Sequence, residues 1–77
     1  MSERQAREGT TIRVHLNGAD REVAAGHTVR SLIEALELHP SLVVVELNRE
    51  ILARDNYGAV PVRDGDAIEL VHFVGGG

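Results

Sequence analysis

The residues best suited to chemistry are the last four, Val74-Gly75-Gly76-Gly77. A glycine carboxylate has no Cβ beside it, so it can enter a narrow channel and be attacked or activated from any side. Glycine also adopts backbone conformations closed to other residues, which suits a tail that changes conformation between partners. A terminal carboxylate has a pKa of about 3.5, so it is an anionic nucleophile at neutral pH. We therefore expect a reactive carboxyl terminus at Gly77; the alternative is a frayed end or a domain cut from a longer chain.

The other residue types leave little room for catalysis by the chain itself. It contains no cysteine, which excludes disulfides, thiolate metal ligands and cysteine nucleophiles. The four histidines are scattered without ligand spacing, so we expect no metal site. No glycine-rich phosphate loop occurs, and the carboxylates fit a solvated helix face and a turn better than an acid–base pair. We expect a protein that is not an enzyme and binds no cofactor.

Length and charge narrow the class of protein further. The 77 residues suffice for one small domain, and a hydrophobic content of 43% with a single Phe and Tyr predicts an aliphatic core. A net charge of −4 argues against a nucleic-acid partner. No apolar stretch approaches the roughly 20 residues of a membrane span, and no signal peptide opens the chain. We expect a cytoplasmic protein that is monomeric in isolation.

A β-hairpin is predicted at the start of the domain. Residues 11–16 alternate polar and apolar side chains, which gives this strand one apolar face. Asn17-Gly18 follows and is a strong hairpin signal, because both central positions of a type I′ turn need positive φ. A second strand is expected to return over about 20–24, with Val23 facing inward.

One helix is predicted after the hairpin. Thr28 is placed as its N-cap. The apolar face carries four residues at helical spacing, Val29, Leu32, Ile33 and Leu36. Pro40 predicts an end at Leu38 or His39, because the residue before a proline avoids helical geometry.

Three further strands are predicted after the helix. The segment 42–47 is β-branched and almost continuously apolar, which indicates a central strand. Beyond it we expect a turn at 48–49 and a short edge strand at 50–52. An irregular segment with one helical turn near Asp55 should follow at 53–61. A glycine turn at 63–66 then leads to the last strand at 67–73.

These elements predict an α+β fold in which a mixed sheet of four or five strands packs on one main helix. A right-handed crossover through the helix places the first and last strands side by side and parallel. This is the ubiquitin-like β-grasp arrangement, and in it the tail leaves from the middle of the sheet. We divide the chain into a disordered N-terminal extension (1–10), a β-grasp domain (11–74) and a flexible reactive tail (75–77).

Five short motifs occur in a characteristic order. They are Asn17-Gly18, Ala25-Gly26-His27-Thr28-Val29, Asn48, Asp64-Gly65-Asp66 and Val74-Gly75-Gly76-Gly77. As an ordered set they resemble a known family, the prokaryotic ThiS-like sulfur carriers of thiamin thiazole biosynthesis. That family usually ends in two glycines, whereas this chain has three. We therefore assign the reactive carboxylate to Gly77, the neighbouring glycine role to Gly76 and extra tail length to Gly75.

The resemblance implies a carrier that is the substrate of other enzymes. An E1-like adenylyltransferase would adenylate the Gly77 carboxylate with ATP and Mg²⁺, and a persulfide from a cysteine desulfurase would replace AMP. The resulting thiocarboxylate would donate sulfur to thiazole synthase. Two alternatives stay open. One is the small sulfur-carrier subunit of molybdopterin synthase, which shares the fold and the glycine ending; the other is a non-covalent β-grasp interaction module with incidental glycines.

A carrier also needs a surface that its partners recognise. Strand alternation turns Val71 and Phe73 outward in the last strand and His72 toward the helix. Val44 is outward on the valine-rich strand by the same rule. We expect Val44, Val71 and Phe73 to form an exposed apolar patch beside the tail, the kind of surface that marks a docking site.

Overall fold

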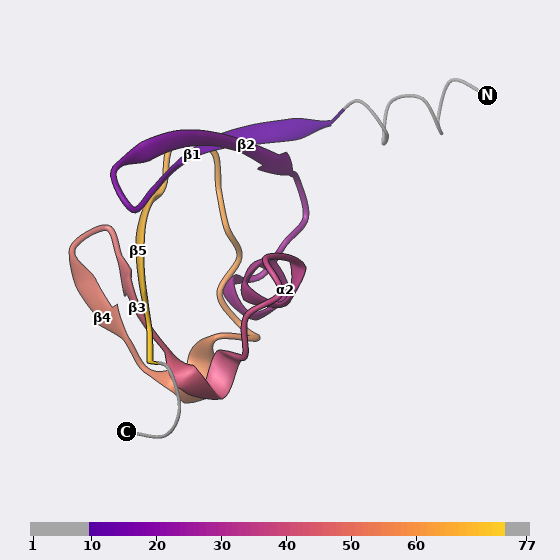
Figure 1. Ribbon diagram of the computed structural model, residues 1–77. Helices are drawn as coiled ribbons and strands as arrows, with labels where there is room; N and C mark the ends of the chain where they lie inside the picture. Colours follow the sequence, from indigo (N-terminus) through magenta and orange to yellow (C-terminus); the bar gives the residue numbers. More distant parts are fainter. Residues whose placement is uncertain (1–9, 74–77) are drawn as a thin grey trace.

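The fold places five strands around one main helix, as Figure 1 shows. The computed structural model describes residues 10–73. Residues 1–9, which belong to the predicted extension 1–10, and residues 74–77, which include the predicted tail 75–77, lie outside the described residues. In chain order the elements are β1 (Thr11–Leu16), β2 (Ala19–Ala24), α2 (Val29–Ala35), η1 (Pro40–Leu42), β3 (Val43–Leu47), β4 (Glu50–Leu52), η2 (Arg54–Asn56) and β5 (Ala67–His72).

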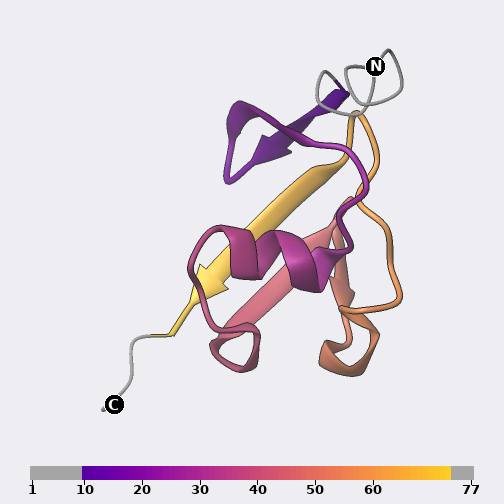
Figure 2. The same cartoon turned by 90° about the vertical axis from the view of Figure 1, so that its right-hand side faces the viewer.

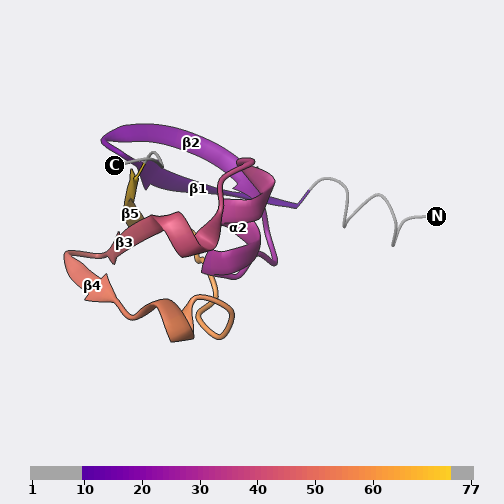
Figure 3. The ribbon, with the colours of Figure 1, turned by 60° about the horizontal axis from the view of Figure 1, so that its bottom comes forward.

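The strands form one mixed sheet in the order β2-β1-β5-β3-β4. β1 and β5 run parallel, with Leu16 opposite Ile68, and the remaining neighbours pair antiparallel. The predicted ubiquitin-like β-grasp arrangement is confirmed, including the parallel first and last strands. The middle strand is β5, and β3 lies beside it, between β5 and β4. Figure 3 shows β2 and β4 at the two ends of the curved sheet.

The helix α2 crosses one face of the sheet, which we call the inner face (Figure 2). The core lies between the two layers and is aliphatic apart from one tyrosine, as the composition predicts. Its buried members are Val14, Leu16, Val29, Leu32, Ile33, Val43, Val45, Tyr57, Val62 and Ile68. Burying such side chains is the main stabilising contribution in a domain of this size. The opposite side of the sheet is called the outer face below.

The opening hairpin has the predicted turn. Asn17 and Gly18 both have positive φ, 52° and 84°, as a two-residue turn of this hand requires. Leu16 pairs with Ala19 directly across the turn. Val23 is partly buried against the core, as expected.

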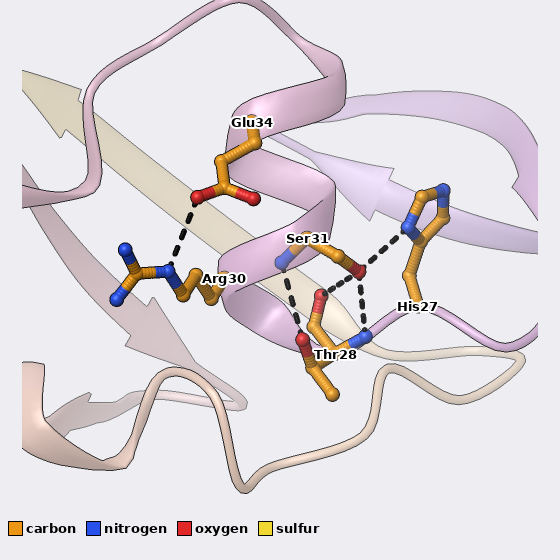
Figure 4. A network of polar contacts seen from close by, with 5 residues as sticks. All are labelled: His27, Thr28, Arg30, Ser31 and Glu34. Atoms are coloured by element: carbon orange, nitrogen blue, oxygen red, sulfur yellow. Dashed lines mark hydrogen bonds and ion pairs between the residues drawn. The ribbon is translucent and has the colours of Figure 1, made fainter.

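The helix begins at the predicted cap, shown in Figure 4. The Ser31 N–H donates to Thr28 Oγ1 over 3.1 Å, and the Thr28 N–H donates to Ser31 Oγ over 2.9 Å. This reciprocal pair satisfies two backbone donors that a helix start otherwise leaves unpaired. His27 Nδ1 lies 2.8 Å from the same Ser31 hydroxyl. On the exposed side, Arg30 forms an ion pair with Glu34 one turn later.

The helix ends earlier than predicted, at Ala35 rather than at Leu38 or His39. Glu37 adopts a left-handed conformation with φ of 65°. Its N–H donates to the Glu34 carbonyl, and the Leu38 N–H donates to the Ile33 carbonyl. These two bonds form the Schellman motif that closes many helices. Pro40 therefore starts η1 and does not set the helix end.

Two strand predictions also need correction. Leu42 belongs to η1, so β3 begins at Val43. His72 was predicted to face the helix, but its side chain is exposed. The register places His72 opposite the buried Val43, so its predicted face is right, although the side chain at this position is not buried. The seven residues of α2 span about 10 Å, and His72 at the end of β5 is left uncovered.

The segment between β4 and β5 closes the open side of the core. The expected helical turn near Asp55 is present as η2. The Tyr57 hydroxyl donates to the Val43 carbonyl over 2.8 Å, which fastens the segment to the start of β3. Gly65 takes up the positive φ of 88° in the turn before β5.

Candidate functional site

The middle strand β5 leads directly to the glycine tail. Phe73, the last described residue, continues the pairing with the neighbouring chain, because its N–H donates to the Leu42 carbonyl over 2.9 Å. The predicted reactive residues Gly75, Gly76 and Gly77 lie outside the described residues. The candidate site is therefore the part of the sheet around the end of β5, from which the tail departs.

Four polar side chains hold β5 in this position. Arg13 N–H donates to Asp64 Oδ1 over 2.9 Å, and this ties the turn before β5 to β1. Asn48 Nδ2 donates to Asp66 Oδ1 over 3.0 Å, and this ties the same turn to the end of β3. The Asn48 Oδ1 also accepts the N–H of Ala67 over 3.0 Å.

The fourth of these side chains is Asn17, in the hairpin turn. Its Oδ1 accepts the Leu70 N–H over 2.7 Å. Asn17, Asn48, Asp64 and Asp66 are all residues of the motifs that carry the family resemblance. In the structure they position the strand that ends in the tail.

The predicted apolar patch is present on the outer face. The side chains of Val71 and Phe73 are 54% and 53% exposed, which is high for apolar residues. Val44 stands directly opposite Val71 on β3 and is half-buried. The register therefore places Val44 beside Val71 as predicted, with Val44 contributing less accessible surface.

Ile51 belongs to the same face and was not predicted. It is the most exposed of the large apolar side chains in the described residues, at 69%. It pairs with Glu46, whereas the next residue, Leu52, pairs with the buried Val45 and packs on the core. The alternation within β4 would have identified Ile51, but a three-residue strand gives a weak pattern. We call Val44, Ile51, Val71 and Phe73 the outer apolar patch.

Two carboxylates border the outer apolar patch. Glu46 and Glu69 are directly opposite each other on β3 and β5. Within residues 10–73, neither forms an ion pair. Like charges in this position destabilise a sheet, so local stability does not explain their pairing. The outer face therefore combines an apolar region with two neighbouring carboxylates.

A shallow hollow lies next to these carboxylates. Its volume is about 360 Å³, and its lining residues are His15, Gly18, Glu46, Arg49, Ala67, Ile68 and Glu69. His15 on its edge is paired with Asp20 across the hairpin. No group of three or more potential metal-ligating side chains comes together in the described residues. Among those residues, no helix has the length and apolar character needed to cross a membrane.

Comparison with known proteins identifies relatives whose match covers both the folded domain and the terminal glycines. The family model described as "ThiS family" matches residues 14–77. A thiazole synthase of Magnetococcus marinus is 42% identical over 66 residues, which cover 86% of this chain and 20% of that protein. The chain thus spans about a fifth of the length of the thiazole synthases that it matches.

Shorter relatives match over most of their own length. The sulfur carrier protein ThiS of Bacillus subtilis is 44% identical over 50 residues, covering 65% of this chain and 76% of that protein. A crystal structure of ThiS from Geobacter metallireducens superposes with a TM-score of 0.73 at 39% identity. The match covers 86% of this chain and all of that one. The family model, the sequence relatives and the superposition agree, and this chain belongs to the ThiS family.

Proposed function

We propose that this protein is a sulfur carrier of thiamin biosynthesis and that its Gly77 carboxylate becomes a thiocarboxylate. The observation that carries the proposal is the extent of the family match, which runs through the middle strand and includes all three glycines. The relatives of similar length bear the name of sulfur carrier protein. In this role the chain is a substrate of its partners and not a catalyst.

The chemistry requires only a terminal carboxylate from this chain. An E1-like adenylyltransferase supplies ATP and Mg²⁺; the Gly77 carboxylate attacks the α-phosphate and pyrophosphate leaves. The terminal sulfur of a persulfide, delivered by a cysteine desulfurase, then attacks the acyl-adenylate and expels AMP. A second thiol reduces the acyl disulfide and releases the thiocarboxylate. Thiazole synthase takes the sulfur from this group, and the carboxylate is regenerated.

The outer apolar patch is the proposed binding surface for these partners. It lies on the sheet face beside the last described residue, so a partner bound there has the tail within reach. Exposed apolar surface of this kind gains binding energy when a partner covers it. The thiazole synthase relatives support thiazole synthase as one such partner, because part of each of those proteins matches this chain.

The first test is the intact mass of the protein after incubation with ATP, the adenylyltransferase, the desulfurase and cysteine. We expect one oxygen to be replaced by sulfur, in the peptide that ends in Gly77. The matched control lacks Gly76 and Gly77 and should keep the mass of its carboxylate form. Loss of Gly77 alone leaves a chain that still ends in two glycines, so this variant tests tail length. Sulfur loading of the variant without Gly76 and Gly77 would contradict the proposal.

The second test concerns the acceptor. The thiocarboxylate form, purified and mixed with thiazole synthase, should lose its sulfur and return to the carboxylate mass. If the thiocarboxylate is stable in the presence of active thiazole synthase, the protein is still a sulfur carrier, but its assignment to thiamin biosynthesis is wrong. The mass of the protein purified from its own cells shows in addition whether Gly77 is a free terminus there.

A further inference from the structure

The strand β5 extends beyond the end of β1, because the two six-residue strands are offset along the sheet. Its pairing with β1 ends at Leu16 opposite Ile68, where the chain turns into the hairpin. On its other side β5 pairs with β3 as far as His72. Figure 2 shows β5 running past the turn of the β1–β2 hairpin toward the tail. Among residues 10–73, the last part of β5 thus pairs with a neighbouring strand on one side only.

Three hydrogen bonds show which backbone groups face the open side. The Phe73 N–H donates to the Leu42 carbonyl, on the β3 side. The Ile68 carbonyl accepts from the Asn17 N–H, and the Leu70 N–H donates to Asn17 Oδ1, both on the hairpin side. Because strand residues alternate in direction, His72 faces the same side as Ile68 and Leu70.

The open edge therefore consists of the Leu70 carbonyl and the N–H and carbonyl of His72. Within residues 10–73, none of these three groups forms a hydrogen bond on the hairpin side. The backbone group that precedes them, the Leu70 N–H, is bonded to the Asn17 side chain, so the open edge begins after it. A short row of unpaired backbone donors and acceptors is a template for an added strand.

We propose that the partner that processes the tail adds an extended segment along this edge of β5. The segment takes the place that a longer β1 would occupy, and it pairs with the backbone of Leu70 and His72. One side of it carries an apolar residue, which meets Val71 and Phe73 on the outer face. This inference rests on the proposed function, because it assigns a binding mode to the same partners.

The position of the hairpin favours a partner segment over a second copy of this chain. If two copies paired antiparallel through this edge, the β1–β2 hairpin turn of each copy would lie where the tail of the other copy leaves β5, and the two would obstruct each other. A single extended segment avoids this obstruction. It also holds the end of β5 from both sides, so the tail starts from a fixed strand when it enters the partner's active site.

The test uses amide hydrogen exchange by NMR on the full chain, free and bound to the adenylyltransferase or to thiazole synthase. In the free protein the His72 N–H should exchange rapidly. In at least one complex we expect its exchange to slow at least tenfold. The Leu70 and Phe73 amides, which are already bonded, serve as internal references. Protection of His72 in the free protein that disappears on dilution would indicate a second copy and overturn the proposal.

A pair of variants separates the backbone from the side chain. His72→Pro removes the N–H on the open side, whereas His72→Ala removes the imidazole and keeps the N–H. We expect His72→Pro to bind the partner about fivefold more weakly, the effect of one lost hydrogen bond, and His72→Ala to bind within about twofold of the parent. Proline is tolerated where the N–H points away from the neighbouring strand.

An ester at the same position removes the N–H without the proline ring. It replaces the Val71–His72 amide. A synthetic C-terminal peptide carrying the ester can be joined by native chemical ligation at a cysteine in place of Ala67, which is then desulfurised to alanine. This is selective because the chain has no other cysteine. If both the ester and His72→Pro bind as tightly as His72→Ala, the edge is not used. Thiocarboxylate formation with an unprotected His72 amide would refute this inference alone. Binding to neither enzyme, with no thiocarboxylate, would refute the proposed function as well.

Discussion

Glu37→Gly is expected to stabilise the domain, although it introduces a glycine next to α2. Glu37 is exposed and holds a φ of 65° as the residue that closes α2. An L-residue in this left-handed region costs about 1 to 2 kcal/mol, whereas glycine adopts it freely. Glycine gains about 0.5 to 1 kcal/mol of conformational freedom in the unfolded chain, which offsets part of the relief.

The difference gives a net stabilisation of about 0.5 to 1 kcal/mol. In a domain of this size that corresponds to a rise in Tm of about 2 to 8 °C. Loss of a carboxylate near the negative end of the helix dipole adds a further gain of about 0.3 kcal/mol. Glu37→Ala removes the same charge and keeps the strained φ, so it measures this second contribution by itself.

The assay is thermal and urea unfolding followed by far-UV circular dichroism, with Ala35→Gly as the matched control. Ala35 is exposed in the last turn of α2, so glycine there should cost about 0.5 to 1 kcal/mol. Two glycine substitutions at neighbouring positions thus have opposite expected signs. If Glu37→Gly lowers Tm as Ala35→Gly does, the Schellman closure at Glu37 is wrong.

Three other substitutions test the core attachment, the helix cap and the docking surface. Tyr57→Phe should destabilise the domain by about 1 to 2 kcal/mol in urea unfolding, because the buried Val43 carbonyl loses its donor; an unchanged midpoint would show that the bond contributes nothing. Thr28→Ala should cost about 1 kcal/mol by the same assay, and Thr28→Ser should recover most of it. Val71→Asp should weaken binding to the adenylyltransferase or to thiazole synthase about tenfold in calorimetry, with a small change in Tm. The exposed Ala59→Asp on the helix side is its control, and equal affinities for the two variants would remove the outer face as the docking site.

Most of the fold could be predicted from local sequence patterns. Alternating strands, the Asn17-Gly18 turn and the Thr28 cap each depend on neighbouring residues, and each appears where expected. The helix end could not be predicted in this way. Leu36 continues the apolar spacing and Glu37 is an ordinary helix former, so nothing local signals a left-handed residue there. Closure at that point is explained by the tertiary packing that Leu38 gains on the core.

The candidate site was predictable to a similar degree, and its errors have a common physical origin. Alternation assigns a residue to a face, and it correctly placed Val71 and Phe73 on the outer one. It does not say whether another layer covers that face. His72 shares the inner face with Val43 and is nevertheless exposed. Ile51 was missed because three residues of β4 give too little pattern.

The structure also gives a role to four residues of the motifs that carry the family resemblance and that lie outside the glycine tail. Asn17, Asn48, Asp64 and Asp66 each accept or donate a hydrogen bond that fixes β5 or the turn before it. β5 is the strand from which the tail departs, so errors in its register would move the carboxylate relative to any partner docked on the outer face. A carrier needs no catalytic residues of its own, but it must present its terminus at a constant distance from its docking surface. We infer that these four side chains serve that requirement. Asn17→Ala should then impair sulfur loading more than its loss of stability alone explains.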